Sequence, residues 1–137
     1  MTEQGVATFI VFEGQARAAM ARYAEIFGDG WVQGPVTLRE GDLQGATGPV
    51  VHATAVLRGH RLTIVDSGAA HGFSLNPAIS LWVDCADQDE LDRLWAGLEE
   101  GGRTYMPRGN YGFAPCFGWV GDRFGVTWQL CAGHPTL

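Results

Sequence analysis

The segment that decides the fold runs from Thr8 to Gly28 and reads TFIVFEGQARAAMARYAEIFG. Its start is mostly apolar and β-branched and is broken by Glu13-Gly14, which predicts a strand over Thr8–Phe12 that ends in a turn. From Gln15 onward, apolar side chains recur at helical spacing, and Gly28 is a natural terminator, so a helix with one buried stripe is expected. The stripe consists of Ala16, Ala19, Met20, Tyr23 and Phe27.

Strand-like stretches follow this helix, and they are separated by glycine-bearing segments that suit turns. A polar, glycine-containing stretch over residues 66–77 then predicts a connector. The expected strands cover approximately residues 36–40, 50–57 and 61–65.

Beyond the connector the same pattern starts again. Residues 78–83 predict a strand, and Asp87 with Glu90 three positions later predicts a capping box that opens a second helix. The apolar stripe of this helix is Leu91, Leu94, Trp95 and Leu98, and strands are expected over about residues 103–106, 116–120 and 126–131, with a turn at 122–125.

The two halves match by type and spacing. Shifting Met20, Tyr23, Ala24 and Phe27 by 71 positions gives Leu91, Leu94, Trp95 and Leu98. We therefore predict a single α+β domain over residues 1–137, with βαβββ modules at about 7–67 and 77–132. The two modules would form a cup-shaped mixed β-sheet with the helices outside. A ferredoxin-like domain is the main rival, but it would leave several strand candidates unexplained.

Composition narrows the classes of function. Fifteen acidic and nine basic residues give a net charge of −6, and the sequence contains no lysine. We therefore expect neither nucleic-acid binding nor attachment to anionic membranes, and lysine-dependent chemistry is excluded. Without a basic, apolar leader or an apolar run of the roughly 18 to 20 residues that span a bilayer, a cytoplasmic protein is expected.

Cys85, Cys116 and Cys131 show no CxxC spacing and are predicted to be buried free thiols.

Strand alternation predicts which residues line the inside of the cup. Thr8 shares a face with Ile10 and Phe12, Ser80 shares one with Trp82, and Gln129 shares one with Thr127 and Cys131. Apolar walls carrying a few polar groups describe a small-molecule pocket. The predicted ligand-binding residues are Thr8, Ile10, Thr63, Ser80, Trp82, Tyr111, Trp119 and Gln129.

Several segments resemble known proteins. Thr8 to Gly28, and the closing DRFGVTWQL from Asp122 to Leu130, resemble the strand-helix opening and the DPxGxxxEL ending of glyoxalase/bleomycin-resistance/dioxygenase proteins. Three segments resemble the PhnB-like branch of this vicinal oxygen chelate superfamily, which is often labelled demethylubiquinone 3-methyltransferase. They are VVHATAVLRGHRLTIVDS, NPAISLWVDCADQDELDRLWAGLEEGG and FGWVGDRFGVTWQL. The resemblance implies the predicted fold and a homodimer.

In metal-dependent relatives the resemblance also implies a divalent ion, held by the first and last strand of each module. The corresponding positions here are Thr8, Ala78, Thr63 and Gln129. None of them carries the imidazole, thiolate or carboxylate that transition metals require, so we expect no metal and no other cofactor, with Gln129 able to offer one neutral oxygen. No GxGxxG turn accompanies the methyltransferase label.

Several candidate site residues allow both a functional and a structural interpretation. His52 could be a general base or a lone metal ligand, but such a histidine is more often a hydrogen-bonded core or interface residue. Trp82 and Trp119 could stack on a planar ligand or belong to the core, whereas Trp128 is expected in the core. Tyr111 could form a lid or simply pack within its loop. Cys116 is conceivable as a nucleophile, and a structural thiol is favoured.

Two functions and a third alternative follow. The leading one is binding of a small aromatic or amphipathic molecule in a metal-free cavity completed by dimerisation. The alternative is a glyoxalase-type lyase, isomerase or transferase, with or without a metal, that uses His52. A pure interaction module is the third.

Overall fold

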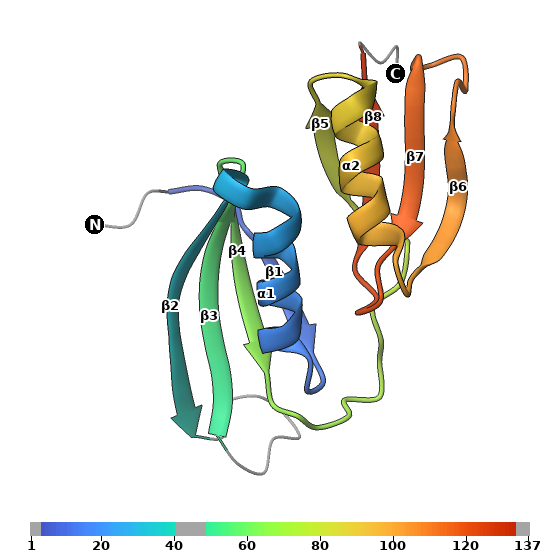
Figure 1. Ribbon diagram of the computed structural model, residues 1–137. Helices are drawn as coiled ribbons and strands as arrows, with labels where there is room; N and C mark the ends of the chain where they lie inside the picture. The colour runs from blue at the N-terminus through green and yellow to red at the C-terminus, as the bar shows by residue number, and fades with distance from the viewer. Residues whose placement is uncertain (1–3, 41–48, 134–137) are drawn as a thin grey trace. The chain divides into compact units, whose positions relative to one another are not determined.

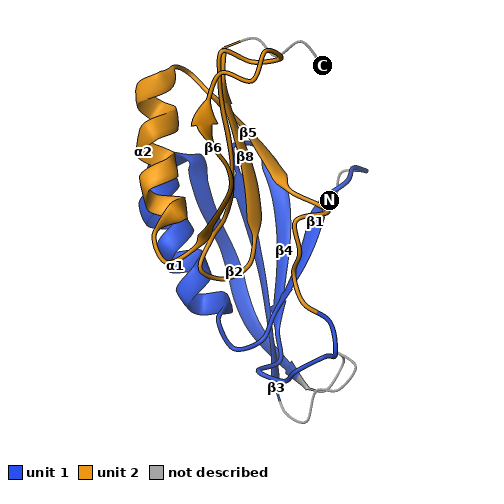
Figure 2. Cartoon of the chain, turned by 90° about the vertical axis from the view of Figure 1, so that its right-hand side faces the viewer, with its two compact units in different colours: residues 1–73 blue, residues 74–137 orange. Residues whose placement is uncertain are grey.

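The computed structural model describes residues 4–40 and 49–133. The chain divides into two compact units, residues 1–73 and 74–137, which Figure 2 colours separately. The division falls inside the predicted connector, and each unit has its own sheet and its own helix (Figure 1). How the two modules combine into a cup within one domain stays a prediction.

The first unit is a four-stranded mixed sheet in the order β1-β4-β3-β2. Strand β1 runs parallel to β4, and the remaining pairs are antiparallel. The elements are β1 (Thr8–Phe12), α1 (Ala16–Phe27), the short 3-10 helix η1 (Gly28–Gly30), β2 (Trp31–Glu40), β3 (Pro49–Leu57) and β4 (His60–Asp66).

The second unit repeats this order as β5-β8-β7-β6, again with its first and last strands parallel. Its elements are β5 (Leu81–Cys85), α2 (Gln88–Glu99), β6 (Arg103–Gly109), β7 (Cys116–Gly121) and β8 (Thr127–Ala132). The prediction of two tandem βαβββ modules is therefore confirmed, and the ferredoxin-like alternative is wrong because the chain forms two sheets and not one.

Each helix lies along one face of its own sheet (Figure 2), and the apolar stripe of each helix is buried. In the first unit Tyr23 of α1 contacts Trp31 with ring centroids 5.6 Å apart. In the second unit Trp95 lies over Gly118, where an added Cβ would collide with the indole ring. Helix α2 starts as predicted, because the Asp87 carboxylate accepts a hydrogen bond from the backbone N–H of Glu90 at 2.8 Å.

Three predicted strand boundaries are wrong. Strand β6 ends at Gly109 instead of residue 106, because it continues past the register shifts on both sides of Met106. Strand β2 starts at Trp31 instead of residue 36, because a bulge between Gln33 and Val36 lets the strand continue through Gly34-Pro35 without a ladder N–H from the proline. Strand β5 starts at Leu81 instead of residue 78, because the Asn76 side chain accepts the Ala78 N–H at 2.9 Å and holds a turn there.

A buried carboxylate organises the first unit. Helix α1 has no side-chain cap of its own at Gln15. Instead Asp66, at the end of β4, accepts hydrogen bonds from the N–H groups of Gly14 at 2.7 Å, Ala16 at 2.8 Å and Gly68 at 2.8 Å. Asp66 therefore satisfies the start of the helix and fastens the β1–α1 turn to the end of β4.

Asp122 has the corresponding task in the second unit. Its carboxylate accepts the N–H groups of Phe124 at 2.9 Å and Val126 at 3.1 Å, and the buried indole N–H of Trp128 at 2.9 Å. Through these bonds Asp122 stabilises the predicted turn at 122–125, and Trp128 is fully buried in the core, as predicted.

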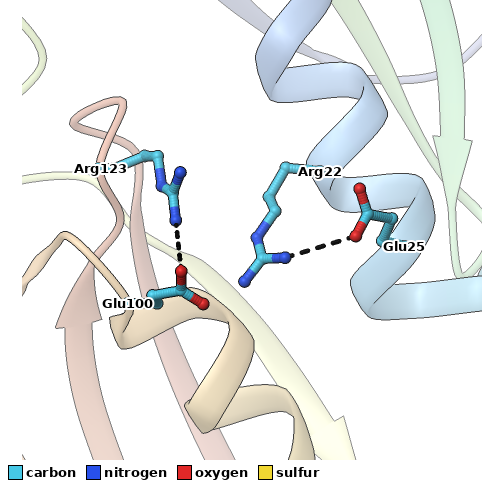
Figure 3. Close-up of polar contacts among 4 residues, drawn as sticks. All are labelled: Arg22, Glu25, Glu100 and Arg123. Carbon is cyan, nitrogen blue, oxygen red and sulfur yellow. Dashed lines mark hydrogen bonds and ion pairs between the residues drawn. The ribbon is translucent and has the colours of Figure 1, made fainter.

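Surface ion pairs add little to this frame. Figure 3 shows two of them, each within its own unit: Arg22 with Glu25 at 3.5 Å, and Arg123 with Glu100 at 3.2 Å. All four side chains are partly or largely exposed, where such pairs contribute at most about 1 kcal/mol. Neither helix in the described ranges is long and apolar enough to cross a bilayer.

We expect Asp66→Ala to lower the free energy of unfolding by roughly 3 kcal/mol, since it leaves backbone donors without their charged acceptor. Chemical denaturation monitored by circular dichroism measures this change. The exposed Asp29→Ala serves as a control that should stay within about 0.5 kcal/mol of the unmodified protein. Equal denaturation midpoints for the two variants would contradict the role given to Asp66.

Candidate functional site

The face of the second sheet opposite α2 brings most of the predicted site residues together. Because Gly118 points to α2, alternation places its neighbours Phe117 and Trp119 on the open face. Trp119 pairs with Gln129, and Gln129 pairs in turn with Trp82. Trp82, Gln129 and Trp119 therefore form one row across β5, β8 and β7, which we call the Trp-Gln-Trp row.

The two indoles of this row lean across β8 in opposite directions. Trp82 reaches towards Phe117, with ring centroids 5.8 Å apart, and Phe117 is the partner of Cys131. Trp119 reaches the other way and donates its indole N–H to the Ser80 hydroxyl at 3.1 Å. Gln129 lies between the two rings.

Ser80 and Trp119 belong to a directed chain of hydrogen bonds. Indole N–H can only donate, so Ser80 Oγ accepts from Trp119. At the other end Thr127 Oγ1 donates to the carbonyl of Ile79 at 2.7 Å. Ser80 must then donate to Thr127, at 2.8 Å, since the single proton of Thr127 is already used. This chain fixes the orientation of Trp119.

Further aromatic rings surround the Trp-Gln-Trp row. Phe117 contacts Phe113 at 4.9 Å and Tyr111 at 5.8 Å between ring centroids, both edge-on. Tyr105 packs on Trp119 at 5.4 Å, and the Arg103 guanidinium lies 5.1 Å from the centre of the Tyr105 ring. The exposed fraction of Trp82 is 38%, and Trp119 and Gln129 are half-buried.

Tyr111 belongs to the segment between β6 and β7, and hydrogen bonds within that segment hold it in place. Its hydroxyl donates to the Pro107 carbonyl at 2.6 Å, and Asn110 accepts the N–H of Gly112 at 2.9 Å. Gly112 has a φ of 88°, which favours glycine at this turn. Tyr111 thus lies beside Phe117, on the Cys131 side of the row, and Ser80 lies on the Thr127 side.

In the first unit the structure corrects the face assigned to two residues. Thr8, Ile10 and Phe12 do share one face, but Ile10 and Phe12 are buried on the side that α1 covers. Thr8 is on the same side and shares a hydrogen bond of 2.8 Å with the His60 ring. The residue of β1 that stands on the open face is Phe9, which is 57% exposed.

Thr63 and His52 are on the open face of the first sheet, since the alternate positions Ala53, Leu62 and Ile64 are buried on the side of the helix. Thr63 pairs with Thr54, and His52 pairs with Val65 and Thr37. The cross-strand neighbours of His52 on these two strands are therefore a valine and a threonine. The roles of Thr63 and His52 in binding or catalysis stay predictions.

The residues at the superfamily's ligand positions do not fit a transition metal. Thr8 and Thr63 carry hydroxyls, Ala78 a methyl group and Gln129 an amide, and Thr8 is already bonded to His60. Among the described residues there is no group of three or more His, Cys, Asp or Glu side chains that could hold a metal ion.

A hollow of about 420 Å³ lies elsewhere in the second unit, and Cys116 is among the residues that line it. Burial raises the pKa of the Cys116 thiol and the nearby Asp92 raises it further, while Arg108 acts in the opposite direction. Arg108 and Asp92 are themselves paired at 2.7 Å. A raised pKa keeps the thiol protonated, which fits the predicted structural thiol and opposes a nucleophile.

Comparison with known proteins gives the family. The model of the 3-demethylubiquinone-9 3-methyltransferase family matches residues 4–131. The chain belongs to this family. The PhnB protein from Bacillus cereus shares 36% identity and a TM-score of 0.80, covering 95% of this chain and 100% of its own. This places the chain in the PhnB-like branch of the vicinal oxygen chelate superfamily.

More distant structures share the fold. Protein PA1353 from Pseudomonas aeruginosa has 24% identity and a TM-score of 0.75, with 96% of this chain and 99% of its own covered. The fosfomycin resistance protein FosX from Mesorhizobium loti has 13% identity and a TM-score of 0.59, with 97% and 94% covered. Comparison with curated proteins gives no match.

The family's description names a methyl transfer, and the helix starts of this chain do not suit a nucleotide-bearing cofactor. In α1 the N–H groups of Gly14 and Ala16 are taken by Asp66. In α2 the side chains of Asp87 and Glu90 accept N–H groups at the start of the helix. Anionic groups bind where such donors are free, so these two helix starts do not fit the phosphate groups of such a cofactor.

Sequence reasoning missed part of the aromatic surround. Phe117 precedes Trp119 by two positions on one strand, so alternation alone would have placed it on the same face. Tyr105 could not be found this way, because β6 carries irregularities on both sides of Met106 that disturb the alternation.

We expect Asp92→Asn to speed alkylation of Cys116 by iodoacetamide severalfold at pH 8. Removing a negative charge lowers the raised thiol pKa, so a larger fraction is reactive thiolate. Mass spectrometry of the Cys116 peptide over time measures the rate. Asp89→Asn, on the same helix and exposed, is the control. An unchanged or slower rate in Asp92→Asn would contradict this account of the thiol.

Proposed function

We propose that this protein binds a small aromatic or amphipathic molecule on the open face of its second sheet, without a metal. The Trp-Gln-Trp row is the observation that carries the proposal. Two indoles lean to either side of one half-buried amide, which gives a planar ring surfaces to stack on and a polar group to meet.

The surroundings of the row support a preformed site. Trp119 is fixed by its hydrogen bond to Ser80 and by its contact with Tyr105. Trp82 is fixed by its contact with Phe117 and by donating its N–H to Asp84 at 3.0 Å. Rings that are already ordered lose little conformational freedom on binding, so more of the stacking energy remains as affinity.

Binding is favoured over catalysis by the side chains of the row and its neighbours. Trp82, Gln129 and Trp119, together with Ser80 and Thr127, include no histidine, lysine or cysteine that could transfer a proton near neutral pH, and burial raises the pKa of the neighbouring Cys131 thiol, which keeps it protonated. The alternative that uses His52 rests on sequence alone, and no contact described above favours it.

The homodimer and the cytoplasmic location expected from the sequence complete the proposal. The homodimer is supported by the resemblance to PhnB-like proteins, and the location by the absence of a bilayer-length apolar run from the sequence.

We expect isothermal titration with 2-naphthol to show saturable binding, weakened about tenfold by Trp82→Leu and by Trp119→Leu. A stacked aromatic ring contributes about 1 to 3 kcal/mol, and about 1.4 kcal/mol corresponds to tenfold in affinity. Phe73→Ala removes an exposed aromatic ring outside the row and should leave binding unchanged. Equal affinities for all these proteins would refute the proposed site.

A separate measurement addresses the metal. Protein purified without chelator should contain well under one equivalent of zinc or nickel by elemental analysis, because the ligand positions offer hydroxyl, methyl and amide groups. Stoichiometric metal lost on Gln129→Leu would refute the metal-free proposal. Metal that remains at full occupancy in that variant would also refute the metal-free proposal, because other residues would then hold the ion. His52→Ala tests whether the imidazole is such a ligand.

A further inference from the structure

The polar groups around the Trp-Gln-Trp row are largely committed to partners inside the second unit. The indole N–H of Trp119 is used by Ser80, whose hydroxyl donates to Thr127. The hydroxyl of Thr127 donates to Ile79. The indole N–H of Trp82 is used by Asp84. None of these donors is free for a ligand unless an internal bond breaks, which is costly where the groups are buried.

Gln129 differs from its neighbours in this respect. Within residues 74–133 its side-chain amide makes no hydrogen bond, although the residue is half-buried between two indoles. A primary amide offers one carbonyl acceptor and an N–H donor side by side in a single plane. An amide in this position can therefore form two parallel hydrogen bonds to the edge of a planar molecule.

The spacing along β8 admits such a molecule. Trp82 leans to the Cys131 side of Gln129 and Trp119 leans to the Thr127 side. Thr127 and Cys131 are four residues apart on one strand, which corresponds to roughly 13 Å. Gln129 lies midway along this length, between the two positions that the indoles reach.

Charge disfavours an anionic ligand. The Asp84 carboxylate flanks the row through its bond to Trp82, and the chain carries a net charge of −6, so anions are disfavoured. The cation on this face, Arg103, lies beyond Trp119 over the Tyr105 ring, on the edge strand β6.

We propose that the ligand is a neutral planar ring that carries a hydrogen-bond donor next to an acceptor, such as a lactam, and that the Gln129 amide recognises this pair. This inference rests on the proposed function and narrows it. A quinone offers acceptors alone and can use only half of the amide. Asparagine and glutamine read adenine through the same donor and acceptor pairing in other proteins.

The experiment compares 2-quinolinone, N-methyl-2-quinolinone and 1,4-naphthoquinone by isothermal titration. The first offers an N–H beside a carbonyl, the second lacks the N–H, and the third has acceptors only. We expect 2-quinolinone to bind at least about tenfold more tightly than the other two, which is the discrimination a bidentate contact provides. This comparison uses the unmodified protein and does not depend on any variant folding.

Gln129→Met keeps the shape of the side chain but removes both polar groups, so it should abolish the discrimination, because 2-quinolinone loses two hydrogen bonds and N-methyl-2-quinolinone only the one to its carbonyl. Gln88→Met, on the exposed surface of α2, is the matched control and should keep the discrimination. Equal binding of the ligands by the unmodified protein, or discrimination that survives Gln129→Met, would overturn the inference while leaving the proposed function intact. Failure of all these probes and of 2-naphthol to bind would overturn both.

Discussion

The parallel pairing of the first and last strand in each unit is the constraint on which the other features depend. Two strands can run parallel only if the chain crosses over between them, and here a helix makes the first part of the crossover, so that one face of each sheet is covered. The register of the pair then decides which side chains are left on the open face. In the second unit, pairing Leu81 with Trp128 directs both to the helix, and pairing Trp82 with Gln129 directs both away from it.

The order of elements could be predicted because local patterns agree with the global fold. The helical stripes, the capping box at Asp87 and the turn at Asp122 all follow from short-range chemistry that the sequence displays directly. The role of Asp66 could not be predicted in this way. Its carboxylate closes hydrogen bonds to Gly14 and Ala16, about fifty residues away, and such contacts exist only after the two strands have paired.

The same distinction explains which site residues were placed correctly. Alternation gives reliable sets of side chains, but it does not say which set faces the helix. In β1 the wrong set was chosen, because Thr8 starts the strand while the buried positions Ile10 and Phe12 define the helix side. In the second unit the bulk of Trp95 against Gly118 sets the choice, and Trp119 and Gln129 then fall on the open face. That contact joins residues 23 positions apart and leaves no local signature in either segment.

The chemistry of this open face follows from where its polar atoms are already bonded. The series of hydrogen bonds on this face uses each donor once. It runs from Trp119 through Ser80 and Thr127, and it ends at the Ile79 carbonyl, which thereby gains a donor at the edge of the sheet. Such a series stabilises the position of an indole but gives a bound molecule little to hydrogen-bond. In the binding that we propose, selectivity on this face depends on Gln129, whose amide makes no hydrogen bond within residues 74–133. Because an amide neither gains nor loses a proton near neutral pH, Gln129 suits the recognition that we propose and not a proton-transfer step.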